Sequence, residues 1–455
     1  MSWKYDLETI AEAVGGVHRG ENRKVDGVST DTRALQPGRL FFALKGENFD
    51  ANTLLDQAFA NGASAVVTSR FDAPGPSIVA ADPLVALQRF ARWHRSQFEI
   101  PVIAITGSCG KTTTKDYIAA LLATKYRVVK TQGNLNNDIG VPLSLLRLVP
   151  GTEAAVIEMG ANHIGEIASL CRMAQPTDSA ITMVGAAHIE GFGSIERVAA
   201  AKSEIASGLG PNGVFYVNND DPWCRRVGIQ YAGSKVQFGR EGDVVLRSCE
   251  ARPGQDMLLD IEPVGRLSLP LPSPAHASNV VLACAIALRH GVTEFQEPLS
   301  EACRQSSRFK VFQLGGLEVI DDTYNANPPS MRAALDALVL RGGGRKMAAL
   351  GDMFELGDMA ESGHAEVGAH AGGHGLSHVF TLGAHAGRMA DAARAAGAAD
   401  ARAMESHEAI AEAVLEAAQP GDVLLVKGSR GMKMEKVIEA MRSLLGVPQE
   451  TQTGH

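Results

Sequence analysis

The chain has 455 residues, enough for roughly three domains of about 150 residues each. Hydrophobic residues make up 45% of it and charged residues 21%, which is typical of a soluble globular protein, and no uncharged apolar run is long enough to span a bilayer. The formal net charge is −8, and no basic stripe with interleaved aromatic residues is present, so nucleic acid is not an expected partner.

The first residues and the cysteines both favour a cytoplasmic protein. The opening MSWKYDLETIAEAV carries early charges and lacks the apolar core of a signal peptide. The six cysteines are scattered and form no Cys-x-x-Cys pair, so neither a disulfide framework nor a cysteine zinc site is expected.

Residues 1–98 are predicted to form a small α/β domain. Its polar turn residues allow two interpretations, a solvated rim or a site for a phosphorylated or nucleotide-linked substrate. The candidate substrate ligands are Ser29, Asp31, Arg33 and Lys45. The predicted elements are helices at Leu7–Val14 and Leu54–Ala60 and strands at Val25–Thr32, Arg39–Leu44 and Ala63–Val67.

The stretch from Val102 to Leu122 predicts a strand, a glycine loop and a helix. The loop has the spacing G-x-x-G-K-[ST], shorter than the strict P-loop. Its backbone N–H groups can surround an anion, Lys111 can reach the outer phosphates of a nucleotide, and the Thr112 hydroxyl can ligate Mg²⁺. An ordinary glycine turn is the alternative, but the correct flanks favour nucleotide binding. Cys109 is interpreted as a tolerated small residue. The residues of the expected cradle are Gly107, Ser108, Cys109, Gly110, Lys111, Thr112 and Thr113.

Residues 99–312 carry this loop and are predicted to form a mostly parallel sheet with helices on both faces. In such sheets ligands bind at the carboxyl ends of the strands, so the polar residues after each strand are candidates for the site. The predicted strands are Arg127–Thr131, Ala154–Met159, Ser179–Val184 and Gly213–Val217, followed by a β-rich stretch at 233–272 and a helix at Ser278–His290.

Three residues of this domain are candidates for metal chemistry. Glu158 at a strand tip can hold Mg²⁺, although it could also serve as a charge at the start of the next helix. His188 follows the next strand, and a lone histidine is more often structural. Lys202 lies in the helix-like run Glu196–Leu209. It is ordinarily a surface lysine paired with Glu204, but as a carbamate formed with CO₂ it would coordinate metal. Residue chemistry alone does not decide between the two interpretations, and it favours the surface lysine.

Residues 313–455 predict a second doubly wound sheet, Rossmann-like but without the G-x-G-x-x-G fingerprint. Five histidines, at positions 364, 370, 374, 378 and 385, cluster in a glycine-rich stretch. Their spacing matches no standard zinc pattern, and glycines at 372, 373 and 375 are expected to interrupt any helix, so no metal site is predicted. The predicted strands are Leu317–Asp321, Lys346–Leu350, His378–Leu382 and Asp422–Val426, and the predicted helices are Pro329–Leu340, Ala384–Ala396, His407–Ala417 and Met434–Leu445.

Motifs in all three domains resemble those of the Mur ligases of peptidoglycan synthesis. They are TGSCGKTTTK, GNLNNDIGVPLSLL, VIEMGANHIGEI, HIEGFGS, AKSEI, HASN, VIDDTYNANPPSM, LGDMFELG and VKGSRGMKME. The segment STDTRALQPGRLFFALKGENFDAN is similar to the part that binds the UDP-muramoyl substrate. It departs from the family at Asp50-Ala51-Asn52, where Asp-Gly-His is frequent. YNANPPSM, and the lack of an Asp-Asn-Pro-Arg motif, favour the members that add D-alanyl-D-alanine.

The resemblance implies a three-domain, cytoplasmic, monomeric ligase that uses ATP and Mg²⁺. Its substrates would be UDP-N-acetylmuramoyl-tripeptide, bound by residues 1–98, and D-alanyl-D-alanine, bound by residues 313–455. An acyl phosphate formed on the tripeptide would be attacked by the dipeptide amine.

The resemblance also implies roles for single residues. Lys111, His188 and Lys202 would be catalytic, with Lys202 carbamylated, and Thr112, Glu158, His188 and Lys202 would serve the metal. Asn279, Arg308, Asp322 and Tyr324 would contact the nucleotide, Asn136 and Asn137 the acyl end of the substrate, and Lys427, Ser429 and Arg430 the dipeptide carboxylate.

Other functions stay open at this point. Within the class, the chain could be the sibling Mur ligase that adds the third residue, or a ligase like folylpolyglutamate synthase. From another class, it could be a nucleotide-binding regulatory module without ligase chemistry.

Overall fold

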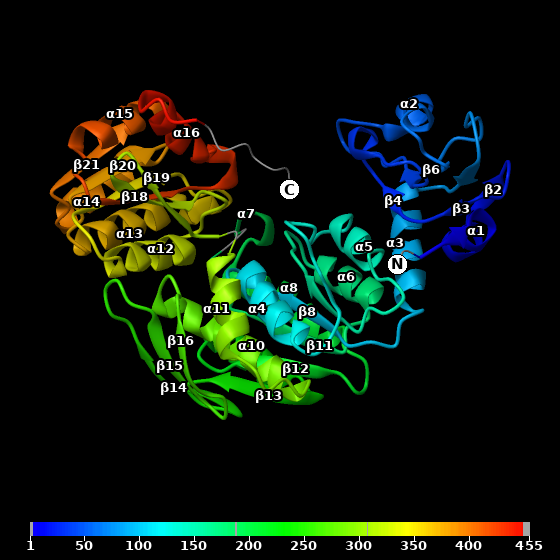
Figure 1. Cartoon of the computed structure of the whole chain (residues 1–455), viewed down its shortest axis with the longest axis horizontal. Coiled ribbons are helices and arrows are strands. Elements are labelled where there is room, and N and C mark those ends of the chain that lie inside the picture. Colours follow the sequence, from blue (N-terminus) through cyan, green and yellow to red (C-terminus); the bar gives the residue numbers. More distant parts are fainter. Residues whose placement is uncertain (1–2, 187–188, 307, 449–455) are drawn as a thin grey trace.

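The computed structural model describes residues 3–186, 189–306 and 308–448. Figure 1 shows three lobes, with the central lobe below and the N-terminal and C-terminal lobes at the upper right and upper left. Each lobe is built on its own sheet, of five, nine and six strands respectively. The expected α/β class is confirmed. In the described parts of the chain, no helix is both long and apolar enough to cross a membrane.

The N-terminal lobe has the strand order β2-β7-β6-β5-β4, with β1 and β3 as a separate pair. The strand predicted over Val25–Thr32 is wrong. Its residues are divided between β3, which pairs with β1, and β4, which pairs with β5 in another sheet. Four elements of this lobe, β1, β2, β7 and α3, were not predicted from the sequence. The elements are β1 (Tyr5–Asp6), α1 (Leu7–Val14), β2 (Val17–Arg19), β3 (Lys24–Val25), β4 (Val28–Ser29), β5 (Leu40–Phe42), α2 (Leu55–Ala60), β6 (Ala65–Thr68), β7 (Ser77–Val79) and α3 (Pro83–Arg95).

Helix α3 fastens this lobe to the central one. Its His94 is fully buried, and its two ring nitrogens lie 2.9 Å from the carbonyl oxygen of Leu148 and 3.0 Å from the hydroxyl of Tyr5. Trp3 donates to the carbonyl of Leu146 at 2.6 Å across the same boundary. Burial lowers the pKa of His94 from 6.5 to about 4.

We expect acid to weaken this boundary. The unfolded chain protonates His94 below about pH 6.5, whereas the folded chain does so only near pH 4. Stability present above pH 6.5 is therefore lost as the pH falls towards 4, by up to about 3 kcal/mol. Urea unfolding midpoints at pH 7 and pH 5 measure the loss. His94→Gln is the control, since it removes the ionising ring, and equal pH dependence in both proteins would contradict the prediction.

The central sheet has the order β16-β15-β14-β13-β12-β11-β8-β10-β9 and is parallel from β14 to β9. Strand β8 lies in its interior and is buried on both faces. Ile103 and Ile105 face one hydrophobic core, and Val102 and Ala104 face the other. The elements are β8 (Val102–Thr106), α4 (Lys111–Ala123), β9 (Val128–Lys130), α5 (Gly140–Leu145), β10 (Ala154–Glu158), α6 (Glu166–Ala174), β11 (Asp178–Ile181), α7 (Ile189–Phe192), α8 (Ile195–Ser207), β12 (Val214–Asn218), α9 (Pro222–Gln230), β13 (Ser234–Gly239), β14 (Val244–Glu250), β15 (Met257–Glu262), β16 (Gly265–Leu269), α10 (Ala277–Arg289) and α11 (Gln296–Arg304).

The C-terminal sheet has the order β17-β18-β22-β19-β20-β21, and only β17 is antiparallel to its neighbour. Three elements of this lobe, β17, β21 and α13, were not predicted from the sequence. The elements are β17 (Lys310–Leu314), β18 (Leu317–Asp322), α12 (Pro328–Leu340), β19 (Lys346–Gly351), α13 (Ala360–Gly373), β20 (His378–Leu382), α14 (Ala386–Ala396), β21 (Asp400–Met404), α15 (His407–Ala417), β22 (Val423–Lys427) and α16 (Glu435–Leu444).

Helix α13 corrects the expectation that glycines would interrupt any helix here. It runs through Gly368 and Gly372. A Cβ atom at these positions would lie 2.1 and 2.2 Å from the carbonyl oxygens of Met389 and Ala393. The glycines therefore allow α13 to pack backbone to backbone against α14, and this packing outweighs their low helix propensity.

Candidate active site

The loop between β8 and α4 has the geometry of a phosphate cradle. Gly110, the N-cap of α4, has a φ of 83°, and Gly107 has a φ of 152°, both in the region that favours glycine. A Cβ atom on Gly107 would lie 1.8 Å from Oγ1 of Thr182. The Lys111 ammonium folds back and donates to the carbonyl oxygen of Gly107 at 2.8 Å. It thus adds a positive charge to that of the helix N-terminus.

The segment after β11 holds this loop in place. The Ser108 hydroxyl accepts from the amide of Gly185 at 2.9 Å and donates to its carbonyl at 3.0 Å. The Thr182 hydroxyl donates to the carbonyl of Cys109 at 2.5 Å. Burial raises the pKa of the Cys109 thiol, so the helix N-terminus does not activate it. This agrees with its interpretation as a tolerated small residue.

Glu158 ends β10, which is paired with β8, and only 2% of it is exposed. Its Oε1 accepts from Nδ2 of Asn136 at 2.8 Å, while its Oε2 is buried with no hydrogen-bond partner among the described residues. A buried carboxylate oxygen without a donor suits a hard cation such as Mg²⁺. The alternative, a charge at the start of the next helix, is wrong, because α6 begins only at Glu166. The nearby Asn137 accepts from the amide of Gly140, the first residue of α5, at 2.9 Å.

Lys202 lies on α8 with 2% of it exposed, and it has no hydrogen bond or ion pair to a described residue. The surface pair with Glu204 is wrong. That carboxylate accepts instead from the amides of Gly165 at 2.6 Å and Ala168 at 2.9 Å. Burial, reinforced by the nearby Lys111 ammonium, lowers the pKa of Lys202 to about 7. Much of the amine is therefore neutral and nucleophilic at neutral pH. His188 lies outside the described residues.

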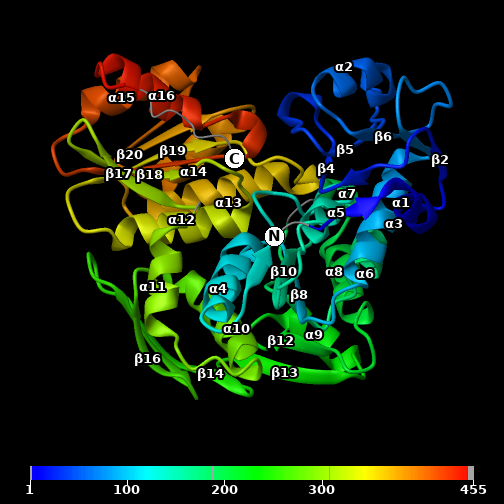
Figure 2. The same ribbon diagram turned by 45° about the vertical axis from the view of Figure 1, so that its right-hand side comes forward.

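Residues of the segment from 308 onward reach the same loop. The Arg308 guanidinium donates to Oγ1 of Thr112 at 3.4 Å and lies 3.1 Å from the ring centroid of Tyr324. Asn327, the N-cap of α12, donates to the carbonyl of Ser108 at 3.5 Å. Figure 2 shows α12 above α4 at this boundary between lobes. Asn279 touches the loop from α10, since its Oδ1 lies 2.6 Å from where a Cβ of Gly110 would be.

Comparison with known proteins decides the family. Residues 105–287 match the Mur ligase middle domain, and residues 307–430 match the Mur ligase, glutamate ligase domain. The UDP-N-acetylmuramoyl-tripeptide–D-alanyl-D-alanine ligase of Escherichia coli (strain K12) is 37% identical over 447 residues, which are 96% of this chain and 98% of that enzyme. The chain belongs to the Mur ligase family.

Solved structures agree with this assignment. The crystal structure of MurF from Acinetobacter baumannii superposes with a TM-score of 0.88 at 32% identity, covering 97% of this chain and 99% of that one. MurF ligase from Thermotoga maritima, solved in complex with ADP, gives a TM-score of 0.82 at 30% identity, covering 92% and 98%. This Mur ligase is therefore an enzyme of the ligase class with the three-domain architecture of its relatives.

The candidate substrate residues of the N-terminal lobe are joined by local contacts. The Asp31 carboxylate binds the Arg33 guanidinium at 2.7 Å and accepts from its amide, and the Ser29 hydroxyl donates to the carbonyl of Asp31. Lys45 lies 3.8 Å from Asp50. Most of the Arg33 side chain is exposed and free to meet a ligand. Their substrate role in this Mur ligase stays a prediction.

The departure from the family motif at Asn52 has a structural consequence. Asn52 is buried, accepts from the hydroxyl of Thr68 at 2.7 Å and donates to the carbonyl of Ala43 at 3.3 Å. It also accepts from the amide of Ser69 at 3.1 Å. In this Mur ligase the position therefore ties together the segments that follow β5 and β6.

The residues expected to hold the dipeptide carboxylate differ in how far they are buried. Lys427 is buried and forms an ion pair with Asp322 at 2.6 Å. Ser429 is buried and accepts from the amide of Phe354 at 2.8 Å. Arg430 is exposed and lies 3.1 Å from Glu435. Arg430 is therefore the more accessible of the two cations for an incoming carboxylate. The role of all three residues stays a prediction.

Three residues that position the site, Lys115, Thr182 and Asn327, were not predicted from the sequence. Lys115 is buried on α4 and donates to the carbonyl of Thr131 at 2.9 Å, just before the loop that carries Asn136. Thr182 and Asn327 contact the phosphate loop directly. Two of them could have been found from their positions in the sequence. Thr182 directly follows a strand, and Asn327 stands three residues before Ser330 in a capping box.

Proposed function

We propose that this chain is an ATP-dependent ligase that joins D-alanyl-D-alanine to UDP-N-acetylmuramoyl-tripeptide, forming the pentapeptide precursor of peptidoglycan. The observation that carries the proposal is the likeness, over nearly the full length of both chains, to relatives that bear this name. The ADP in the Thermotoga maritima structure supports ATP as the nucleotide. We expect a cytoplasmic monomer with no nucleic-acid partner.

We assign one ligand to each part of the chain. Residues 1–98 would bind the UDP-muramoyl-tripeptide, residues 99–312 would bind ATP, and residues 313–455 would bind the dipeptide. The phosphate loop lies in the second part and is contacted by Asn327 of the third part, so nucleotide binding would favour closure of the C-terminal lobe on the central one. The amide of Glu190 already donates to the carbonyl of Glu355 between these lobes at 3.1 Å.

The proposed reaction has two steps. The terminal carboxylate of the tripeptide attacks the γ-phosphate of ATP and displaces ADP, giving an acyl phosphate. The dipeptide amine then attacks the acyl carbon, and phosphate leaves as the amide forms. Because two anions meet in the first step, the Lys111 ammonium and the Arg308 guanidinium would offset their repulsion. Closure of the lobes would keep water from the acyl phosphate.

The described residues fit a bound Mg²⁺. The unpartnered Oε2 of Glu158 and the hydroxyl of Thr112 are oxygen ligands of the kind that this ion prefers. When bound, Mg²⁺ would supply charge neutralisation at the phosphates. The role of His188 in the same site stays a prediction.

A carbamate on Lys202 also fits this environment. The buried amine, with its pKa lowered to about 7, can attack CO₂, form an N–C bond and release a proton. The product is an anion, so it would remove the repulsion between the ammonium groups of Lys202 and Lys111, and could ligate metal.

A substrate panel tests the proposal. Phosphate release is measured with ATP and Mg²⁺ for three substrate pairs: UDP-N-acetylmuramoyl-tripeptide with D-alanyl-D-alanine, the shorter muramoyl-dipeptide with diaminopimelate, and a folate with glutamate. We expect release and a new amide only with D-alanyl-D-alanine. Turnover with diaminopimelate on the shorter muramoyl-dipeptide would identify the sibling ligase, and turnover with glutamate on a folate would identify a folylpolyglutamate-synthase-like enzyme. ATP binding without phosphate release would identify a regulatory module.

A further inference from the structure

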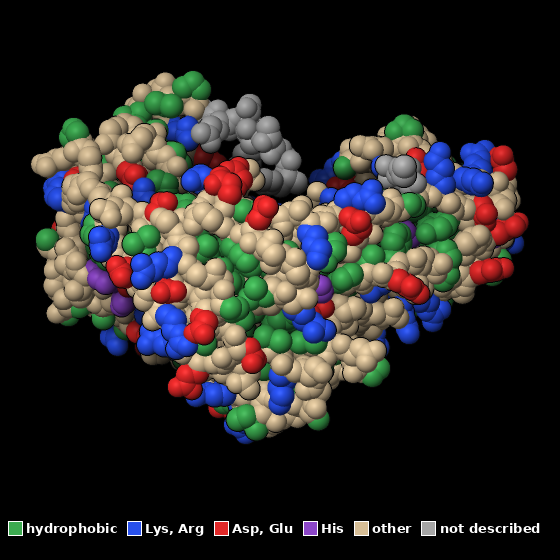
Figure 3. Space-filling model, turned by 60° about the horizontal axis from the view of Figure 1, so that its bottom comes forward, with side chains coloured by type: hydrophobic (Ala, Val, Ile, Leu, Met, Phe, Trp, Pro, Cys, Tyr) green, Lys and Arg blue, Asp and Glu red, His purple; other side chains and the backbone are tan. Residues whose placement is uncertain are grey.

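Helices α12 and α13 lie side by side on one face of the C-terminal sheet and are joined by side chains at matching turns. Arg332 of α12 forms an ion pair with Glu366 of α13. One turn further along both helices, Asp336 faces His370 and His374. Figure 3 shows histidine side chains at the surface beside an acidic one on the left of the molecule.

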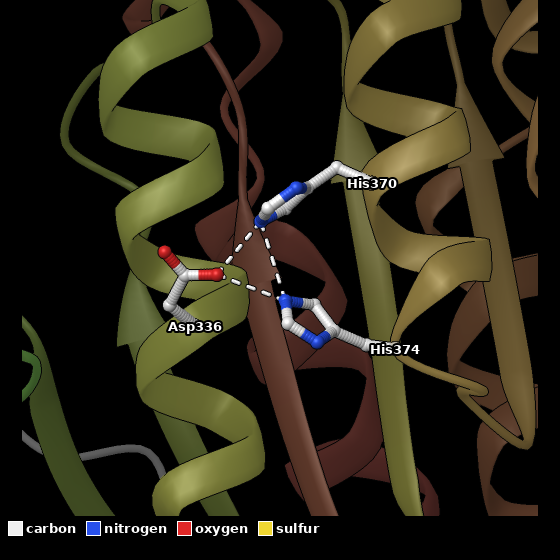
Figure 4. Close-up of side chains that lie close together, drawn as sticks. All are labelled: Asp336, His370 and His374. Atoms are coloured by element: carbon white, nitrogen blue, oxygen red, sulfur yellow. Dashed lines mark hydrogen bonds and ion pairs between the residues drawn. The ribbon is translucent and has the colours of Figure 1, made fainter. Parts of the chain in front are cut away.

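Three ligand atoms of this second group converge on one point. Oδ1 of Asp336 lies 2.7 Å from Nε2 of His370 and 2.8 Å from Nε2 of His374, and the two nitrogens lie 3.2 Å apart (Figure 4). Hydrogen bonding accounts for only part of this arrangement. If both rings donate to the carboxylate, two N–H groups crowd each other, and if one ring does not donate, its lone pair faces the carboxylate oxygen. A cation at this point would resolve both conflicts.

We propose that Asp336, His370 and His374 form a binding site for Zn²⁺ or a similar divalent transition metal. Two imidazole nitrogens and one carboxylate oxygen are a common three-residue zinc set, and water would take the fourth position. The water has access, because the three side chains are between 28 and 41% exposed. In a tetrahedral site with ligands at about 2.0 Å, the ligand atoms are about 3.3 Å apart, so the carboxylate needs to withdraw by only about 0.5 Å.

The helices explain why the site is present. His370 and His374 are four residues apart and therefore lie on the same face of α13, with His374 at its C-cap. Asp336 is presented by α12 from the other side. The bound metal would fasten the two helices together and stabilise the C-terminal lobe.

The site is separate from the phosphate loop. Asp336 lies nine residues after Asn327, the residue of α12 that contacts Ser108, so it is roughly 13 Å further along the helix. Two other histidines of this lobe are not part of the zinc site. His364 and His385 stack on each other, and His364 lies 3.6 Å from Asp352. Substitutions in the zinc site are therefore expected to leave ligation unchanged.

Zinc titration of the full chain without a polyhistidine tag tests this proposal. A chromophoric chelator competes for Zn²⁺ in excess Mg²⁺, which occupies sites that prefer oxygen ligands. We expect one Zn²⁺ site in the wild-type chain. Its affinity should fall at least about 100-fold in His370→Asn, His374→Asn and Asp336→Asn. Removing a residue that only hydrogen-bonds to a metal ligand already lowers affinity by up to about 100-fold, and these variants lose a ligand itself. Zn²⁺ should also raise the Tm of the wild-type chain but not that of the three variants.

Glu366→Gln is the matched control. It breaks the neighbouring contact between α12 and α13 while leaving all three ligands in place, so it should bind Zn²⁺ with wild-type affinity. The proposal is overturned if the wild-type chain binds no Zn²⁺, or if the three ligand variants bind it as tightly as Glu366→Gln does. Circular dichroism of each variant tests whether it is folded, so that a loss of binding can be assigned to the missing metal-ligating side chain.

Discussion

Lys111→Ala is expected to lower kcat by at least about 100-fold, the loss that follows removal of one group that stabilises developing charge. The Lys111 ammonium lies over the phosphate loop, held by the carbonyl of Gly107 at 2.8 Å. From there it can move to the outer phosphates of ATP, where the negative charge of the attacking carboxylate must be offset. The measurement is the rate of phosphate release at saturating ATP, tripeptide and dipeptide.

Lys125→Ala is the control for this prediction. Lys125 follows the same helix, α4, but its ammonium is exposed and donates to the carbonyl of His290 at 3.0 Å, far along the helix from the loop. It should keep nearly full activity. Turnover of Lys111→Ala within a few-fold of the wild-type rate would contradict the assigned role.

Lys202→Ala is expected to lower kcat by a similar factor, for a different reason. If a carbamate at this position supplies an anionic metal ligand, alanine removes the ligand and leaves a cavity beside the site. Added formate or acetate should then restore part of the rate by placing a carboxylate in the vacated space. The rate of phosphate release with and without these anions measures the effect.

The same anions should not rescue Lys111→Ala, because that variant lacks a cation. This difference separates replacement of a lost anion from a general effect of salt. Full activity of Lys202→Ala without additives would exclude the carbamate role. A second readout is independent of activity, since ¹³CO₂ should give a carbamate signal by NMR in the wild-type chain and none in Lys202→Ala. Because the pKa of Lys202 is about 7, the signal should weaken as the pH falls below 7 and the amine becomes protonated.

Local features of the chain could be predicted from the sequence where neighbouring residues determine them. The strand Val102–Thr106 and the helix beginning at Lys111 follow from a β-branched run, a glycine loop and an apolar period, all within one short stretch. Elements held by more distant contacts were less predictable. The strand expected over Val25–Thr32 is divided because β3 pairs with β1, whereas β4 pairs with β5 in another sheet. Helix α13 forms in a glycine-rich stretch because α14 packs against it.

The sequence by itself determined the chemistry of the centre of the site. The order of Lys111, Thr112 and Glu158 along a parallel α/β pattern predicts a cation, a hydroxyl and a carboxylate at one edge of a sheet, because the carboxyl ends of parallel strands meet there. Tertiary structure decided the state of each group. Burial of Lys202, away from Glu204, makes its amine a nucleophile, and the lack of a donor for one Glu158 oxygen makes that oxygen available to metal. Only the packing of α12 on α13 brings Asp336 to His370 and His374, since a contact between residues 34 positions apart depends on how two helices dock and leaves no local pattern in the chain.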